Sequence, residues 1–348
     1  MEPNVKTVMI TGGFGYVGSR LTPLLLDSGY NVTVLDLCLY GEQGLDDLKK
    51  RSDWSELQNR LRFVKGDIRD PEAIQQALEG ADAVIHLAAI SNDPTGQMDE
   101  VLTKQVNFDA VGVLVKMAKQ AGVKRFINAS SSSVFGVKDE SDIKEFLEPE
   151  PITYYSKYKA LAEWIVKAAA ADDFITTSIR PATICGYSPR QRFDLTVNKL
   201  TADGLTKKVI TVHGGEQRRP NLAMTDMIQF YKHLLSADPK LVNGQVFNFG
   251  FQNMKVIEIA ECIKGELSDL DVEIKVTDTL DKRDYHISSQ KLLDRLHYQP
   301  VGSIEKEVAN LRKAIEEKII DDVDADTWYN MKCFSLERNN KPYEFLAN

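Results

Sequence analysis

The feature that most constrains this chain is a regular alternation of short apolar segments and amphipathic segments through its first half. The apolar segments are partly β-branched and have the length of buried strands: Val5–Thr11, Asn31–Asp36, Leu61–Lys65, Ala83–Leu87, Arg125–Ala129 and Ile175–Arg180. Helical patterns lie between them at Tyr16–Ser28, Pro71–Leu78, Glu100–Ala121 and Tyr155–Ala171. Because parallel strands need crossover connections, this spacing predicts an α/β fold with a doubly wound parallel sheet and helices on both faces.

The second half of the chain follows a different pattern. After Arg180 the segments are punctuated by Pro and Gly, with expected strands at Gln245–Phe249 and Val272–Val276 and expected helices at Val256–Glu266 and Ile304–Ile319. We therefore expect a smaller, mixed α/β C-terminal lobe. The predicted boundaries assign 1–185, with a returning segment near 221–262, to the large domain, 186–220 and 263–320 to the lobe, and 321–348 to an acidic, irregular tail.

Charge and composition exclude several classes of function. The chain has 43 Lys and Arg against 51 Asp and Glu, a formal net charge of -8. Nucleic acids and anionic membranes bind basic faces, so neither is an expected partner. The sequence lacks the ~20 consecutive apolar residues of a membrane-spanning helix. Its four cysteines form no CxxC pair, so neither a disulfide framework nor a metal site is expected. These features predict a cytoplasmic protein.

One basic segment contrasts with this acidic background. From Arg180 to Pro220 the chain has eight Lys and Arg but only three Asp and Glu. Two interpretations stay open for Arg190, Arg192 and Arg218. They bind phosphate groups of small ligands, or they form a solvated basic loop.

A glycine-rich turn joins the first expected strand to the first expected helix. It reads TGGFGYVG over residues 11–18, and both GxGxxG and GxxGxxG can be drawn through Gly12, Gly13, Gly15 and Gly18. Glycine lets the backbone turn tightly and approach a diphosphate, whose charge is favoured by the helix N-terminus. This strand-turn-helix context predicts a dinucleotide-binding site.

Two acidic residues are candidates for contacts with the adenosine half of such a ligand. Asp36 ends the second strand, where its carboxylate can accept hydrogen bonds from ribose hydroxyls and would repel a 2′-phosphate, so NAD is favoured over NADP. Asp67 follows the third strand in the sequence GDIRD. It either contacts the adenine end of the ligand or caps the helix that begins near Pro71, and both alternatives stay open.

Tyr155 and Lys159 are the candidate catalytic pair. They lie four residues apart on an expected helix and share one face, so the ammonium can stabilise the ionised phenol. Lowering a tyrosine pKa from about 10 to about 7 needs roughly 4 kcal/mol, which the lysine and a nicotinamide cation could supply together. A serine run over residues 130–133 follows the fifth strand, and one of its hydroxyls is expected to face the site.

Together these motifs resemble the extended short-chain dehydrogenase/reductase family, and within it the NAD-dependent nucleotide-sugar epimerase/dehydratase branch. The resemblance covers about residues 5 to 300 and rests on TGGFGYVG, Asp36, GDIRD, His86–Ala89, Asn107, SSSSVFG, YSKYK with Glu163, RPATICG, Arg219 with Asp226, FNFG and the segment around Arg283. It implies a Rossmann domain for the cofactor and a smaller lobe for the sugar nucleotide.

The resemblance also implies roles for individual residues. Tyr155 is the general base, Lys159 orients it and Ser131 assists. The residues implied to contact NAD are Gly12, Gly15, Tyr16, Val17, Gly18, Asp36, Asp67, Ile68, Leu87, Ala88, Ala89, Asn107, Tyr155, Lys159 and Pro181. Those implied to contact the substrate are Ser91, Ser132, Ser133, Thr183, Arg219 and Arg283.

Departures from the family pattern select among its reactions. The 4,6-dehydratases carry Asp and Glu where this chain has Ser132 and Ser133, so dehydration is disfavoured. The resemblance then implies an epimerase that oxidises a nucleotide sugar, usually at C4, and reduces it again with the same cofactor. A nucleotide-sugar dehydrogenase or reductase with net NAD(P)H turnover is the alternative, followed by a non-catalytic NAD-binding regulator. Thr183 replaces an asparagine that contacts the sugar nucleotide in the family, so no specific sugar is assigned.

The same resemblance implies a homodimer. The expected helices at 100–121 and 155–171 have apolar stripes beyond what one sheet face requires. In the family these helices pair across a two-fold axis as a four-helix bundle. The expected ligands are therefore NAD and a nucleotide-diphosphate sugar, and the expected protein partner is a second copy of the chain.

Overall fold

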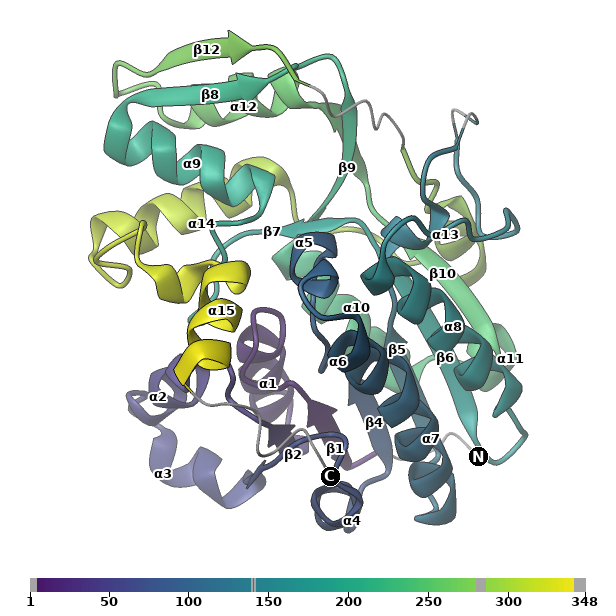
Figure 1. Cartoon of the computed structure of the whole chain (residues 1–348). Coiled ribbons are helices and arrows are strands. Elements are labelled where there is room, and N and C mark those ends of the chain that lie inside the picture. The colour runs from purple at the N-terminus through teal and green to yellow at the C-terminus, as the bar shows by residue number, and fades with distance from the viewer. Residues whose placement is uncertain (1–4, 139, 141, 280–285, 341–348) are drawn as a thin grey trace.

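The computed structural model describes residues 5–138, 140, 142–279 and 286–340, with side chains described through residue 335. Its centre is a seven-stranded sheet in the order β10-β6-β5-β4-β1-β2-β3, in which all neighbouring strands run parallel (Figure 1). The strands are β1 Thr7–Thr11, β2 Asn31–Asp36, β3 Leu61–Lys65, β4 Ala83–His86, β5 Arg125–Ala129, β6 Ile175–Pro181 and β10 Gln245–Phe249. The doubly wound parallel sheet expected from the sequence is confirmed.

Helices cover both faces of this sheet. Successive side chains of a strand point to opposite faces, so Val8 and Ile10 of β1 enter one core and Met9 enters the other. The covering helices are α1 Gly18–Asp27 and α10 Met224–Ser236 on the first face, and α4 Pro71–Leu78, α7 Ala110–Gln120 and α8 Tyr154–Ala168 on the second. A sheet buried on both faces explains why its strands read as nearly continuous apolar runs.

The chain reverses its direction of winding beside β1. From β1 it proceeds outward to β2 and β3, whereas β4, β5, β6 and β10 lie on the other side. At such a switch point the loops after the two adjacent strands diverge and leave a crevice beyond the carboxyl ends. The loops that begin at Gly12 after β1 and at Leu87 after β4 border this crevice.

A smaller lobe lies beyond the carboxyl ends of the strands (Figure 1). It contains a parallel pair, β8 Val209–His213 and β12 Glu273–Thr277, packed with α9 Thr196–Lys207, α12 Val256–Glu266 and α14 Ile304–Glu316. A mixed sheet, β11-β9-β7, is formed by β7 Thr183–Cys185, β9 Arg218–Ala223 and β11 Gln252–Lys255. The expected mixed α/β lobe is confirmed.

The remaining elements are short. They are the helices α2 Gln43–Lys49, α3 Trp54–Leu57, α5 Asp93–Gln97, α6 Glu100–Lys104, α11 Pro239–Val242 and α13 Gln290–Leu296, a π-helical turn at Gln105–Asp109, and 3-10 turns at Gln58–Arg60 and Ser132–Phe135. Within the described ranges, no helix has both the length and the apolar character needed to cross a membrane.

The C-terminal segment differs from the irregular tail expected from the sequence. A 3-10 turn at Asp326–Trp328 leads into helix α15, Asn330–Asn340. The Phe334 side chain is only 1% exposed and packs in a small cluster with Ile90 and Leu102. Because these partners lie more than 200 positions earlier in the chain, tertiary contacts order a segment whose own sequence lacks a clear helical pattern.

Candidate active site

A large cavity opens where the strands of the main sheet end. Its volume is about 2010 Å³, roughly twice the ~1,000 Å³ at the upper end of ordinary small-ligand pockets. The wall includes the glycine turn, the loops that follow β2, β3, β4 and β5, the first turns of α8, and residues of the C-terminal segment. A space of this size accommodates more than one ligand of nucleotide size.

Most residues implicated by the sequence lie in this wall. They are Gly12, Gly15, Tyr16, Val17, Gly18, Asp36, Asp67, Ile68, Leu87, Ala88, Ala89, Ser91, Ser131, Ser132, Ser133, Tyr155, Lys159, Pro181, Thr183 and Arg219. Asn107 is not part of the wall, and Arg283 lies outside the described residues. Motifs spread from Gly12 to Arg219 therefore converge on one cavity.

The glycine turn is shaped so tightly that side chains would obstruct it. Gly12 has a φ of +71°, and a Cβ there would lie 2.8 Å from the Ala88 backbone nitrogen. A Cβ on Gly18 would collide with the Gly12 carbonyl oxygen and lie 2.6 Å from Gly13 Cα. The turn thus presents bare backbone at the start of α1, which fits the diphosphate of a dinucleotide.

The Asp36 carboxylate is anchored at the end of β2. Its Oδ2 accepts a hydrogen bond from the Phe14 backbone N–H at 2.8 Å, and its Oδ1 accepts one from the Cys38 N–H at 2.8 Å. Burial raises the pKa of Asp36, while these two bonds and the charge of Arg190 act in the opposite direction. Each oxygen keeps further acceptor capacity, so Asp36 can still accept hydrogen bonds from ribose hydroxyls.

Asp67 is held by an arginine rather than by a helix. Its carboxylate pairs with Arg69, with Nη2 to Oδ2 at 2.5 Å and Nε to Oδ1 at 3.0 Å. The N-cap of α4 is Asp70, whose side chain accepts a hydrogen bond from the Glu72 N–H at 2.9 Å. The helix-cap alternative for Asp67 is therefore wrong, and its carboxylate lies in the cavity wall beside Ile68.

Asn107 supports the cavity from behind the wall. Its Oδ1 accepts a hydrogen bond from the Ile90 N–H at 2.9 Å, and its Nδ2 donates one to the Ile90 carbonyl at 2.9 Å. The residue belongs to the π-helical turn before α7 and is 1% exposed. These two bonds hold the loop after β4 in place, and the expected contact of Asn107 with the cofactor stays a prediction.

Tyr155, Lys159 and Ser131 meet at the carboxyl end of β5. Ser131 is the hydrogen-bond partner of the Tyr155 phenol, and its Oγ lies 2.9 Å from Ser133 Oγ. Lys159 Nζ donates to the carbonyl oxygen of Ala129, the last residue of β5, at 2.8 Å. The carboxyl end of β5 thus brings Ser131 together with Tyr155 and Lys159. The tyrosine and the lysine share one face of α8.

The electrostatics of this group differ from the sequence expectation. Burial raises the pKa of Tyr155 to about 12; the Ser131 hydrogen bond and the charge of Arg192 act to lower it, and the charge of Asp93 raises it further. Burial also lowers the pKa of Lys159 to about 8. The lysine is itself desolvated and bonded to a backbone carbonyl, so the chain's own groups keep the phenol neutral at neutral pH.

A buried ion pair lies behind this group. Glu163 of α8 binds Arg180 of β6 through three contacts, Nη2 to Oε2 at 2.7 Å, Nε to Oε1 at 2.9 Å and Nε to Oε2 at 3.2 Å. Ser130 Oγ donates to the same carboxylate, and the Arg180 guanidinium lies 4.7 Å from the centre of the Phe135 ring. The network ties α8 to the ends of β5 and β6 and thereby fixes the helix that carries Tyr155.

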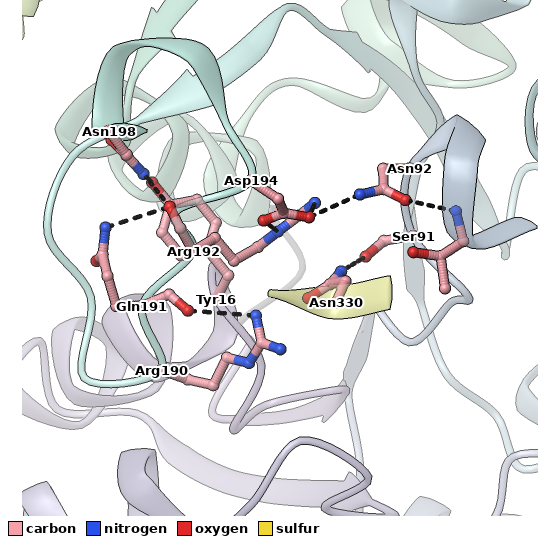
Figure 2. A network of polar contacts seen from close by, with 10 residues as sticks. Tyr16, Ser91, Asn92, Arg190, Gln191, Arg192, Asp194, Asn198 and Asn330 are labelled. Carbon is pink, nitrogen blue, oxygen red and sulfur yellow. Dashed lines mark hydrogen bonds and ion pairs between the residues drawn. The ribbon is translucent and has the colours of Figure 1, made fainter. Parts of the chain in front are cut away.

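The structure adds Asn92, Asp194 and Asn330 to the wall, none of which the sequence implicated. Asn92 Nδ2 donates to Asp194 Oδ2 at 2.7 Å, and Asp194 also pairs with Arg192 at 2.8 Å (Figure 2). Asn330 Nδ2 donates to Ser91 Oγ at 2.9 Å. The basic composition of the 180–220 segment was the sequence signal for Arg192, whereas nothing local marked Asn330.

The structure decides between the two interpretations of the basic segment for two of its arginines. Arg190 and Arg192 lie in the cavity wall and are 2% and 8% exposed. The solvated-loop interpretation is therefore wrong for these two residues. Arg218 is half-buried in β9 and is not a wall residue.

Comparison with known proteins places the chain among related sequences and folds. A sequence model of the NAD dependent epimerase/dehydratase family matches residues 8–250. The Bacillus subtilis protein described as "Uncharacterized UDP-glucose epimerase YtcB" is 27% identical over 320 residues, which are 87% of this chain and 96% of that protein. Mouse "dTDP-D-glucose 4,6-dehydratase" is 28% identical over 264 residues, 74% of this chain and 71% of that protein. Alignments with several other curated relatives cover only 42–48% of their length.

A solved structure shares the fold over most of both chains. UDP-glucuronic acid 4-epimerase from Bacillus cereus, in complex with UDP-glucuronic acid and NAD, superimposes with a TM-score of 0.77 at 23% identity. The superposition covers 89% of this chain and 99% of that one. The likeness extends through both the main sheet and the smaller lobe.

Proposed function

Because the chain belongs to the NAD dependent epimerase/dehydratase family, whose cofactor is NAD, we propose that it is a nucleotide-sugar epimerase acting through a transient keto sugar. The observation that carries this proposal is the convergence of Tyr155, Ser131 and Lys159 in the wall of a cavity that also contains the glycine turn. A tyrosine that is hydrogen-bonded to a serine beside a dinucleotide site is suited to proton exchange with a sugar hydroxyl.

In the proposed reaction Tyr155 moves the proton. Its phenolate accepts the proton of the sugar C4 hydroxyl and gives it back when the keto group is reduced. Ser131, already bonded to the phenol, holds the reacting oxygen in place. When bound, NAD would supply the hydride exchange at C4 and a positive ring charge that favours the phenolate. General acid-base help of this kind typically contributes about 10²–10⁴-fold to the rate.

The side chains in the cavity wall favour epimerisation over dehydration. Elimination of water from the keto sugar needs a further acid and base, and the family's dehydratases have carboxylates where this chain has Ser132 and Ser133. Asp93 acts electrostatically on Tyr155, but its Oδ1 already accepts a hydrogen bond from Thr153 Oγ1 at 2.5 Å. The serine hydroxyls can hold a sugar but cannot remove a carbon-bound proton at neutral pH.

The proposed substrate class is a nucleoside-diphosphate sugar. Arg219 lies in the cavity wall and has the planar fork that suits a diphosphate, and Thr183 offers a hydroxyl at the end of β6 and start of β7. The similar Bacillus cereus enzyme is described with UDP-glucuronic acid and NAD. We propose only this class of substrate, and the nucleotide and the sugar are to be identified by experiment.

A panel of substrates tests the proposal. The purified chain with NAD is given UDP-, GDP-, CDP- and dTDP-sugars while NADH absorbance and sugar stereochemistry by NMR are followed. A new epimer without accumulating NADH is expected. Stoichiometric NADH would instead identify a dehydrogenase, and no change with any sugar despite tight NAD binding would reject both. Tyr155→Phe is the matched variant, since it removes only the phenol oxygen and should abolish turnover while NAD still binds.

We also propose that the chain forms a homodimer through α7 and α8. Leu161 and Trp164 on α8, which packs against α7, are 38% and 62% exposed, which is unusual for apolar side chains of their size. Sedimentation at micromolar concentration is expected to show a dimer, and Trp164→Glu is expected to yield a monomer. A wild-type monomer at these concentrations would contradict the proposal.

A further inference from the structure

The loop that carries Arg190 is pinned to the glycine turn. Tyr16, inside the turn, donates its phenol proton to the Gly186 carbonyl at 2.9 Å and accepts a hydrogen bond from Asn198 Nδ2 at 3.0 Å. The Ser188 hydroxyl donates to the Tyr16 carbonyl at 2.7 Å. These bonds are buried and hold the 186–192 loop in a fixed place relative to the backbone that receives a diphosphate.

Arg190 enters the cavity wall from this loop with most of its hydrogen-bonding capacity unused. Its side chain is 2% exposed, and its guanidinium carbon lies over the Tyr40 ring, 4.2 Å from the ring centre. Nη1 makes one long contact, 3.4 Å, to the Gln191 carbonyl (Figure 2). Nε and Nη2 are buried and have no hydrogen-bond partner among the described residues.

The carboxylates near Arg190 are already held by other groups. Asp194 pairs with Arg192 through both oxygens and also accepts from Asn92. Asp36 acts on Arg190 only through its charge, because its two oxygens face the backbone N–H groups of the glycine turn and of the loop after β2. Burial, followed by the charge of Arg192, lowers the pKa of Arg190 to about 10, which leaves it charged at neutral pH. A buried, unpaired cation is costly unless it has an anion to bind.

We propose that Arg190 is an anion-binding residue for the cofactor's diphosphate, on the side opposite the glycine turn. This inference rests on the proposed use of the cavity for NAD. A guanidinium presents two parallel N–H groups, which match two oxygens of a phosphate, and Nε and Nη2 of Arg190 are that pair. Its neighbours are Asp36, the last residue of β2, and Tyr40, in the loop that follows. The adenosine half of a dinucleotide lies at this place in the fold, so the cofactor is favoured over the sugar nucleotide.

NAD binding by the full-length protein, stripped of nucleotide, tests the assignment. Arg190→Met keeps the length and the apolar contact with Tyr40 but removes the charge. Its Kd for NAD, measured by calorimetry, is expected to rise about 10- to 100-fold, as for other buried charge-assisted hydrogen bonds. Arg190→Lys keeps the charge but not the planar pair of N–H donors. Its Kd for NAD is expected to lie between those of the wild type and Arg190→Met. Arg20→Met is the matched control, because Arg20 also lies over a tyrosine ring, that of Tyr187, but outside the wall.

A second readout separates binding from a structural role. Because Arg190 is unpaired without ligand, the melting temperature of nucleotide-free Arg190→Met is expected to equal or exceed that of the wild type. A lower melting temperature together with unchanged NAD affinity would overturn the proposal. UDP and GDP binding are measured in parallel: weaker nucleoside-diphosphate binding with unchanged NAD affinity would also overturn it and assign Arg190 to the substrate. The test does not require turnover, so a wild type that binds NAD but converts no sugar contradicts only the proposed function.

Discussion

Asn330 Nδ2 donates a hydrogen bond of 2.9 Å to Ser91 Oγ across 239 positions of the sequence. The bond joins the first residue of α15 to the loop after β4, and both residues lie in the cavity wall. Phe334, one turn further along α15, is buried beside Ile90 of the same loop. The C-terminal helix is therefore a part of the wall and not an appendage of the smaller lobe.

This docking predicts that α15 slows the release of NAD. Phe334→Ala removes the helix's buried anchor, and such substitutions typically cost about 3–5 kcal/mol of packing. We expect the dissociation rate of NAD, followed by stopped-flow fluorescence, to rise at least about tenfold, because a tenfold change needs only about 1.4 kcal/mol. Ser335→Ala, at a neighbouring position outside the wall, is the control. Equal release rates for Phe334→Ala and wild type would show that the helix does not retain the cofactor.

The glycine turn predicts a sharp contrast between two glycine substitutions. Gly18→Ala places a Cβ against the Gly12 carbonyl and the Gly13 backbone, so the turn must open and NAD affinity should fall at least about tenfold. Gly265→Ala in α12 meets no atom within 4 Å and should leave affinity unchanged while stabilising its helix by up to ~1 kcal/mol. Calorimetric titration with NAD and thermal melts measure both effects. Wild-type affinity in Gly18→Ala would refute this account of the turn.

Lys159 predicts a pH dependence of stability. Burial lowers its pKa to about 8 in the folded, nucleotide-free chain, whereas an unfolded lysine titrates near ~10.4. Between these values the unfolded state holds more protons, so the contribution of Lys159 to the free energy of unfolding rises with pH. Urea unfolding of wild type and Lys159→Met from pH 7 to 9.5 should show the wild type gaining stability relative to the variant above about pH 8. A constant difference over this range would mean that Lys159 keeps an ordinary pKa.

The Glu163–Arg180 pair predicts a large loss of stability when one partner is neutralised. The two side chains are 5–6% exposed, so Glu163→Gln leaves a buried guanidinium without its counter-charge, at a cost of about 3–5 kcal/mol. Glu79→Gln breaks the exposed pair with Arg62, where the side chains are 37% and 67% exposed, and should cost less than about 1 kcal/mol. Urea denaturation compares the two variants. Similar small losses in both would indicate that water reaches the buried pair.

Much of the fold follows from patterns that act over short stretches of chain. The apolar strands, the helical periodicities and the glycine turn each depend on neighbouring residues, so β2, β3 and β5 have the expected limits and the turn has the expected shape. The same holds for Tyr155 and Lys159, because four residues on a helix necessarily share a face. Parallel strands then bring the loops at their carboxyl ends together, which explains why scattered motifs meet in one cavity.

The remaining features depend on burial and on contacts between distant segments. The sequence marked Arg190 and Arg192 as basic but left open whether water or protein surrounds them, and only the tertiary structure buries both. It likewise joins Asn330 to Ser91 and gives Asp70, rather than Asp67, the cap of α4. The neutral phenol of Tyr155 has the same origin, since a pKa depends on the groups packed around a side chain. The sequence by itself determined the strands, the glycine turn and most of the chemistry-bearing residues that face the cavity. Desolvation and long-range packing, which no local pattern records, decided their charge, their partners and the rest of the wall that encloses them.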